Sequence, residues 1–98
     1  MKKKLKITVV KRDFYKDLAD EYANKDVGIC EAVKDGQVYI LEGPDKPEDF
    51  CSWAWADIQR DVVAILYGAS YPWINRPNAV ISCCTDGIRP VVFKLELI

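Results

Sequence analysis

The chain has 98 residues, of which 50% are apolar and 30% charged, with a formal net charge of -1 and no histidine. This composition is that of a single globular domain spanning residues 1–98, and it excludes a disordered segment, a collagen-like repeat and a coiled coil. Nucleic acid is disfavoured as a partner, because the chain has no overall positive field to concentrate phosphate.

The first half of the chain predicts a strand, a helix and a second strand. Apolar residues alternate with polar ones from Leu5 to Val10, which predicts a strand. Asp13 is placed to cap a helix over residues 14–23, whose apolar residues recur at every fourth position. The dipeptide Asp35-Gly36 then predicts a hairpin turn or strand entry that leads into a strand over residues 38–41.

A long helix is predicted next, from about Ser52, which is a good N-cap residue, to Tyr67. Its apolar residues form a stripe at helical spacing, and Gly68 is placed to end it. Asp57 and Asp61 fall on the opposite face, so we expect both of them to be exposed to solvent.

Residues 79–84 and 88–97 predict a hairpin joined by Thr85-Asp86-Gly87, a type I turn followed by glycine in the left-handed region. In that register Ile81 faces Val91 on the core side. The elements together predict an α+β fold, a small sheet of about four strands, largely antiparallel, with two helices packed on one face.

Four cysteines in three separate parts of the chain are the candidate metal or thiol site: Cys30, Cys51, Cys83 and Cys84. About four thiolates at roughly 2.3 Å satisfy tetrahedral zinc, and four also serve an iron–sulfur cluster. The Cys-x-x-Cys spacing typical of such sites is absent, which weakens this interpretation. A thiol-redox site and plain packing in the core are the alternatives.

The adjacent cysteines, Cys83 and Cys84, are expected in opposite environments, because neighbouring residues of a strand point to opposite faces of a sheet. Cys83 is in line with Ile81 and is expected in the core, whereas Cys84 lies on the other face. Cys51 is at the start of a helix, where the dipole favours a thiolate. Cys51 and Cys84 are therefore the leading reactive or ligating candidates, and a strained vicinal disulfide across the pair is a further alternative.

Aromatic residues indicate a second class of function. Trp53, Trp55 and Trp73, with Tyr67 and Tyr71, form a candidate cluster that lines a pocket or an interface. This favours a non-catalytic binding or assembly module, with an identical subunit in a homo-oligomer or another protein as its partner. Burial in a small core is the ordinary alternative, but two tryptophans two positions apart on a helix cannot share one face.

A small-molecule enzyme is the third hypothesis, with Asp57, Asp86 or Arg89 around a pocket. Turn geometry and a surface ion pair are the more usual roles of such residues. The lack of histidine excludes Cys-His and Ser-His hydrolytic pairs, and no glycine-rich phosphate loop is present.

The sequence also predicts a cytoplasmic location without membrane contact. The opening segment has no uninterrupted apolar stretch of the kind that a signal peptide needs, and no apolar run approaches the roughly 20 residues that span a bilayer. Cysteines in the cytoplasm are normally reduced, so a disulfide framework is the less expected use of the four thiols.

Two segments, "FCSWAWADIQ" and "CCTDGIRPVVFKLE", resemble the motifs Cys-x-Trp-Ala-Trp-x-Asp-Ile and Cys-Cys-Thr-Asp-Gly-x-Arg-Pro-Val of a family of uncharacterised small prokaryotic proteins. Cys30 before "KDGQVYIL" resembles a third element of that family. The resemblance covers nearly the whole chain and implies a shared fold with shared cysteine motifs. It supplies no reaction, but motifs that combine Cys, Trp, Asp, Gly and Arg raise the expectation of a cysteine-centred site.

Overall fold

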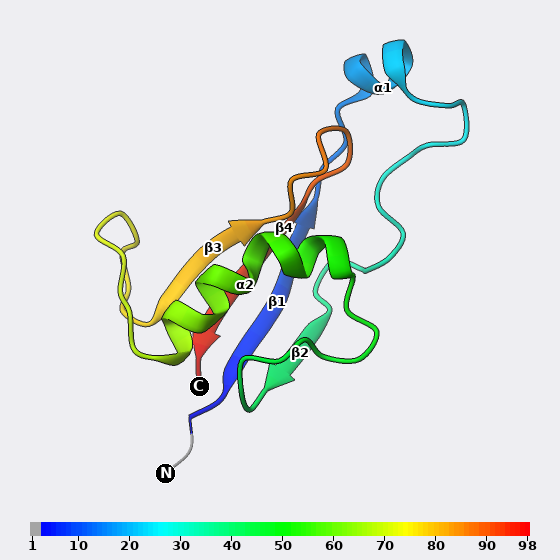
Figure 1. The fold of residues 1–98 in the computed structure, drawn as a ribbon. Helices are drawn as coiled ribbons and strands as arrows, with labels where there is room; N and C mark the ends of the chain where they lie inside the picture. The colour runs from blue at the N-terminus through cyan, green and yellow to red at the C-terminus, as the bar shows by residue number, and fades with distance from the viewer. Residues whose placement is uncertain (1–2) are drawn as a thin grey trace.

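The computed structural model describes residues 3–98, which form one antiparallel sheet and two helices (Figure 1). The strands are β1 (Leu5–Arg12), β2 (Val38–Leu41), β3 (Ala79–Cys83) and β4 (Val91–Leu97), and the helices are α1 (Lys16–Tyr22) and α2 (Ser52–Leu66). The strands lie in the order β2-β1-β4-β3, and every neighbouring pair is antiparallel. The predicted α+β fold is confirmed.

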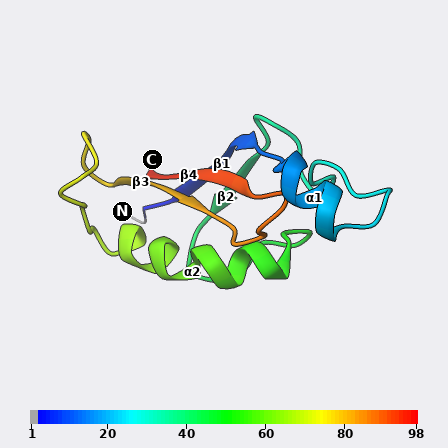
Figure 2. The same cartoon turned by 90° about the horizontal axis from the view of Figure 1, so that it is seen from above.

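The helix α2 packs along one face of the sheet and leaves the other face open (Figure 2). Its buried apolar residues recur at helical spacing and contact the strands β1, β3 and β4: Ala54, Ile58, Val62 and Ile65. Alternate residues of β1 and β4 point toward them and complete the core: Leu5, Ile7, Val9, Val91, Phe93 and Leu95. Gly68 follows the helix with φ of 93°, so the predicted end of α2 is confirmed.

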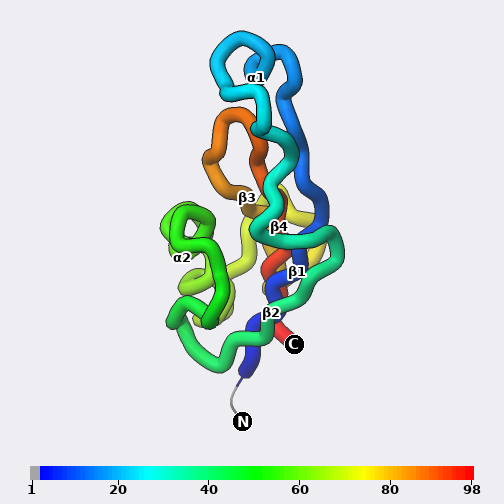
Figure 3. Tube along the Cα trace, turned by 90° about the vertical axis from the view of Figure 1, so that its right-hand side faces the viewer, coloured from blue at the N-terminus to red at the C-terminus, as the bar shows by residue number. Residues whose placement is uncertain are grey.

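The short helix α1 lies beyond the end of the sheet rather than over the face that α2 covers (Figures 1 and 3). β1 continues to Arg12 past a shift in its pairing register with β4, so the chain has already left the sheet when α1 begins. Asp13 does not cap the helix, because its carboxylate accepts a hydrogen bond from the Phe14 N–H at 2.9 Å and Tyr15 is the N-cap. Within α1 only Ala19 is buried, so its apolar stripe stays largely exposed.

The strands β3 and β4 pair in a different register from the predicted one. Ile81 lies opposite Lys94 instead of Val91, and it is 51% exposed on the open face. The predicted three-residue turn is also wrong, since the ladder closes earlier, where the Cys84 N–H donates to the Val91 carbonyl at 3.0 Å. The carboxylate of Asp86 accepts two backbone N–H groups inside the connection and stabilises a wider loop.

Asp61 of α2 is buried, which corrects its expected place on the exposed face of the helix. Its carboxylate accepts hydrogen bonds from the hydroxyl groups of Tyr71 and Ser82, both at 2.8 Å. Partial burial and the bond to Asp61 raise the pKa of Tyr71 above its ordinary value. These bonds satisfy the buried carboxylate and tie α2 to β3 and to the loop that follows the helix.

Candidate functional site

Three of the four cysteines line one pocket of about 310 Å³ at the N-terminal end of α2. Cys30 comes from the segment before β2, Cys51 from the start of α2, and Cys84 from the residue after β3. Apolar residues form most of the remaining wall: Val33, Ala54, Val91 and Phe93. The fold therefore brings three cysteines that are far apart in the sequence to the lining of one pocket.

Cys51 is the N-cap of α2, one residue before the predicted cap Ser52. Its carbonyl accepts the Trp55 N–H at 2.9 Å and so starts the helix, while its side chain makes no capping hydrogen bond. The first turn of α2 carries no acidic residue, so the positive end of the helix dipole is not balanced from within that turn. Cys51 is partly exposed, and its thiol is left available to the pocket.

The adjacent cysteines occupy positions opposite to those predicted. Cys84 is buried and belongs to the core, and its Sγ accepts a hydrogen bond from the Val91 N–H at 3.2 Å. Cys83 is exposed and does not line the pocket. The cause is the register of β3, in which Val80 and Cys84 face the core while Ile81 and Cys83 face away from it.

Cys30 is positioned by an arginine that the sequence analysis did not single out. The Nη1 of Arg12 donates to the carbonyls of Cys30 at 3.0 Å and Val33 at 3.2 Å, and its Nε contacts Asp35 at 3.0 Å. These bonds hold the segment before β2 against the end of β1. The sequence does show Arg12 as a long, charged hydrogen-bond donor at the end of a strand, but an arginine in such a position is usually exposed to solvent.

Two of the predicted site residues, Asp57 and Asp86, hold the loop between β3 and β4. Asp57 accepts the Thr85 N–H at 2.7 Å and the Thr85 hydroxyl at 2.9 Å, which fixes the loop to α2. Asp86 accepts the N–H groups of Ile88 and Arg89 at 3.0 Å and contacts the Arg89 Nε at 3.3 Å. Partial burial raises the pKa of Asp86, but these donors together lower it by more than burial raises it. The pKa of Asp86 therefore lies below its ordinary value.

The predicted aromatic cluster is divided between the two ends of α2. Trp55 packs edge-on against Phe50 at 5.7 Å between ring centroids, whereas Trp73 stacks on Tyr71 at 5.0 Å in the loop after the helix. Trp53, in the first turn, is 66% exposed and lines the cysteine pocket. The aromatic residues therefore serve the core, the pocket and the loop separately.

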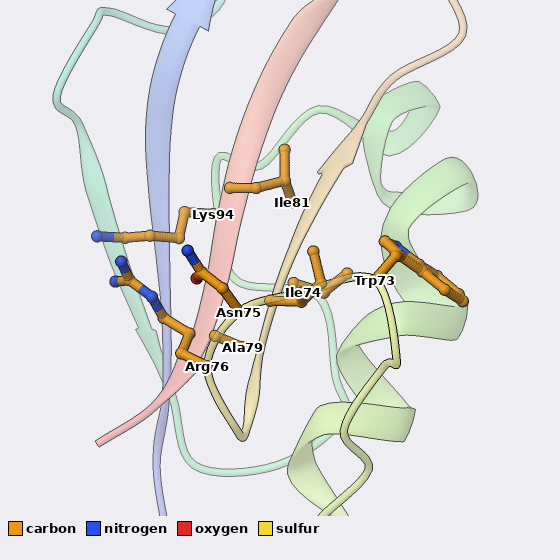
Figure 4. A pocket seen from close by; sticks show the side chains of 8 residues that line it. Trp73, Ile74, Asn75, Arg76, Ala79, Ile81 and Lys94 are labelled. Atoms are coloured by element: carbon orange, nitrogen blue, oxygen red, sulfur yellow. The ribbon is translucent and has the colours of Figure 1, made fainter.

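A second pocket, of about 480 Å³, lies beside β3 and is lined in part by residues of the open face. The loop after α2 contributes Trp73 and Arg76, and the strands contribute Ile81 and Lys94. Figure 4 shows the charged ends of Arg76 and Lys94 on one side of this pocket and Trp73 on the other. No cysteine lines it, so it is separate from the thiol pocket.

The four cysteines do not fit a resident metal centre in this arrangement. Within residues 3–98, no three Cys, Asp or Glu side chains are grouped so that they could hold a metal ion. Cys83 is exposed outside the pocket of the other three, whereas a zinc or iron–sulfur site needs about four converging ligands. All four cysteines are free rather than disulfide-bonded.

Comparisons of the chain with family models, curated proteins and solved structures found no match. The resemblance of its two motifs to a prokaryotic family therefore stays a prediction. Neither helix of the described part of the chain has the length and apolar character that crossing a bilayer requires.

Proposed function

We propose that this protein carries out thiol–disulfide exchange in the pocket lined by Cys30, Cys51 and Cys84. The supporting observation is that three segments distant in sequence each contribute a thiol to the same pocket. Cys84 is 7% exposed and belongs to the core, whereas Cys30 and Cys51 pack against the edge of the core and stay partly exposed, so a small molecule can reach them.

Cys51 is the attacking thiol in this proposal, because its side chain is partly exposed and makes no capping hydrogen bond. As a thiolate it attacks one sulfur of a low-molecular-weight disulfide, forms a mixed disulfide and releases one thiolate. Cys30 or Cys84 then attacks the Cys51 sulfur, forms a protein disulfide and releases the second small thiol. Two electrons pass from the protein to the small disulfide, which is the oxidant.

The experiment uses dipyridyl disulfide and the Cys83→Ser variant, which removes the exposed thiol outside the pocket. In the rapid phase we expect this variant to release two thiopyridone molecules per chain and to retain no probe, because the second pocket thiol displaces the probe from Cys51. The third pocket thiol then adds at most one slowly released thiopyridone and one bound probe. In the double variant Cys83→Ser/Cys51→Ser, the rapid phase disappears. The single variants Cys30→Ser and Cys84→Ser on the same background identify the second thiol, since the variant that lacks it keeps the probe bound.

Two results would overturn this proposal. One is a folded Cys83→Ser variant whose pocket thiols each keep one probe molecule, which would show independent thiols rather than exchange. The other is stoichiometric zinc that stays bound through gel filtration and masks Cys30, Cys51 and Cys84 until a chelator is added. That outcome would make the three thiols metal ligands in a rearranged pocket.

A second candidate function, assembly with a protein partner or an identical subunit, is favoured by the exposed aromatic residues after α2. Trp73 is 74% exposed and Tyr67 78% exposed, although such residues usually bury most of their area. We propose Trp73 as the contact. Sedimentation of the Trp73→Ser variant should then show a smaller assembly than the parent protein. The control is Trp53→Ser, which should sediment like the parent. If the parent and both variants are monomers, self-assembly is excluded.

A further inference from the structure

Two charged side chains line the thiol pocket, the guanidinium of Arg89 and the carboxylate of Asp86. The Nε of Arg89 contacts Asp86 at 3.3 Å, and within residues 3–98 the two terminal nitrogens of Arg89 donate no hydrogen bond. The side chain is 45% exposed, so these nitrogens are accessible from solvent. Two parallel N–H donors of this kind match the two oxygens of a carboxylate.

The carboxylate of Asp86 fixes this guanidinium on one side. It accepts two backbone N–H groups from its own loop in addition to the Nε contact, so its oxygens are already engaged. The backbone of the loop is itself held to α2 by Asp57. Arg89, which lines the pocket that contains the thiols, is therefore carried by an ordered loop.

Apart from Arg89, its partner Asp86 and the three cysteines, the wall is apolar. Val33, Val91 and Phe93 line the pocket and are at most 5% exposed, so a ligand that enters meets carbon on this side. The volume of about 310 Å³ is at the lower end of the range of ligand sites, roughly 300–1,000 Å³. This combination suits a short aliphatic chain with one charged end.

We infer that the pocket recognises a small aliphatic disulfide, or the corresponding thiol, that carries a carboxylate. The carboxylate lies on the terminal nitrogens of Arg89, and the sulfur is directed to the thiols of the pocket. This inference rests on the proposed exchange function and names the class of its substrate. The first turn of α2 carries no acidic residue, so the positive end of its dipole adds a further preference for negative charge on the ligand.

The test compares three small disulfides of similar length and different charge: dithiodiglycolate, which is anionic, hydroxyethyl disulfide, which is neutral, and cystamine, which is cationic. The rate at which the free Cys51 thiol is consumed, as the mixed disulfide or as the protein disulfide, is followed by mass spectrometry after acid quenching, on the Cys83→Ser background. We expect Arg89→Gln to slow the reaction of dithiodiglycolate with Cys51 about tenfold, because a charge-assisted pair is lost. The rate of reaction of hydroxyethyl disulfide should stay unchanged. The reaction of cystamine should stay the same or become faster.

The matched control is Arg60→Gln, which removes the same charge from an exposed arginine of α2 that does not line the pocket. It should leave all three rates unchanged. Equal slowing by the two variants would assign the effect to net charge and would overturn the inference, as would an Arg89→Gln variant with the rate ratios of its parent. If Cys51 of the folded protein reacts with none of the three disulfides, the exchange function itself fails, and the inference fails with it.

Discussion

The two faces of the sheet bury the same kinds of residue to very different extents. On the face covered by α2, Phe93 and Leu95 are 1% and 0% exposed, whereas on the open face Ile40 and Ile81 are 49% and 51% exposed. All of them are large apolar residues within strands, so side-chain type does not separate them. The position of each residue relative to α2 decides which side chains form the core, and hence which cysteine of the adjacent pair belongs to the pocket.

The largest expected effect is a difference in stability between the two faces. Leu95→Ala should reduce the free energy of unfolding by about 2–5 kcal/mol, because it leaves a cavity in the core. Ile81→Ala on the open face should change it by no more than about 0.5 kcal/mol. Urea denaturation followed by circular dichroism measures both, and comparable losses in the two variants would show that something covers the open face in solution.

The adjacent cysteines give the next largest difference. In the folded protein, iodoacetamide should alkylate the exposed Cys83 on the order of 100 times faster than the buried Cys84, since Cys84 reacts only after local opening. Peptide mapping by mass spectrometry after timed quenching separates the two sites. The two rates should converge in urea, and equal rates without urea would contradict the register of β3.

A smaller effect is expected at the contact between α2 and the loop that follows it. Asp61→Ala leaves the hydroxyl groups of Tyr71 and Ser82 without their acceptor, and should cost about 1–3 kcal/mol of unfolding free energy. The phenol of Tyr71 should also titrate closer to its ordinary pKa in an ultraviolet titration. Gln59→Ala, at a neighbouring exposed position, is the control, and an equal loss there would argue against a special role of Asp61.

The smallest effect concerns the loop that joins β3 to β4. Because the pKa of Asp86 is lower in the folded protein than its ordinary 3.8, ionised Asp86 stabilises the fold above that value, and the contribution is lost as the pH falls through the folded-state pKa. Asp86→Asn should therefore be less stable than the parent protein at neutral pH, and the difference should shrink in acid. Thermal unfolding between neutral and strongly acidic pH tests this, and a difference independent of pH would contradict it.

The element order and the antiparallel sheet could be predicted because periodicity and turn residues are local signals. The strand Val38–Leu41 and the end of α2 at Gly68 were predicted in this way, and both are confirmed. The hairpin register was wrong because Thr85-Asp86-Gly87 is compatible with a tight turn, whereas Asp86 and Asp57 together stabilise a wider loop. That choice depends on a contact between residues far apart in the sequence, which periodicity does not report.

The cysteines of the site were singled out from the sequence, but their arrangement was not. A register error in β3 exchanges the two faces, so the expected environments of Cys83 and Cys84 were reversed. Arg12 was missed because its role depends on the carbonyl of Cys30, which belongs to a segment without regular secondary structure. Asp61 was placed on the wrong side of α2 because a buried carboxylate needs partners that only the tertiary structure supplies.

The strand order places β1 and β4, the first and last strands, side by side in the middle of the sheet (Figure 1). The centre of the sheet cannot form on the ribosome until residues 91–97 have been released from the exit tunnel, so until then Leu5, Ile7 and Val9 lack their main partner strand. Bringing such distant segments together reduces the entropy of the chain between them before any stabilising contact forms, and this slows folding. We therefore expect the growing chain to expose the apolar residues of β1 during synthesis. We also expect it to need protection from aggregation until β4 can pair with β1.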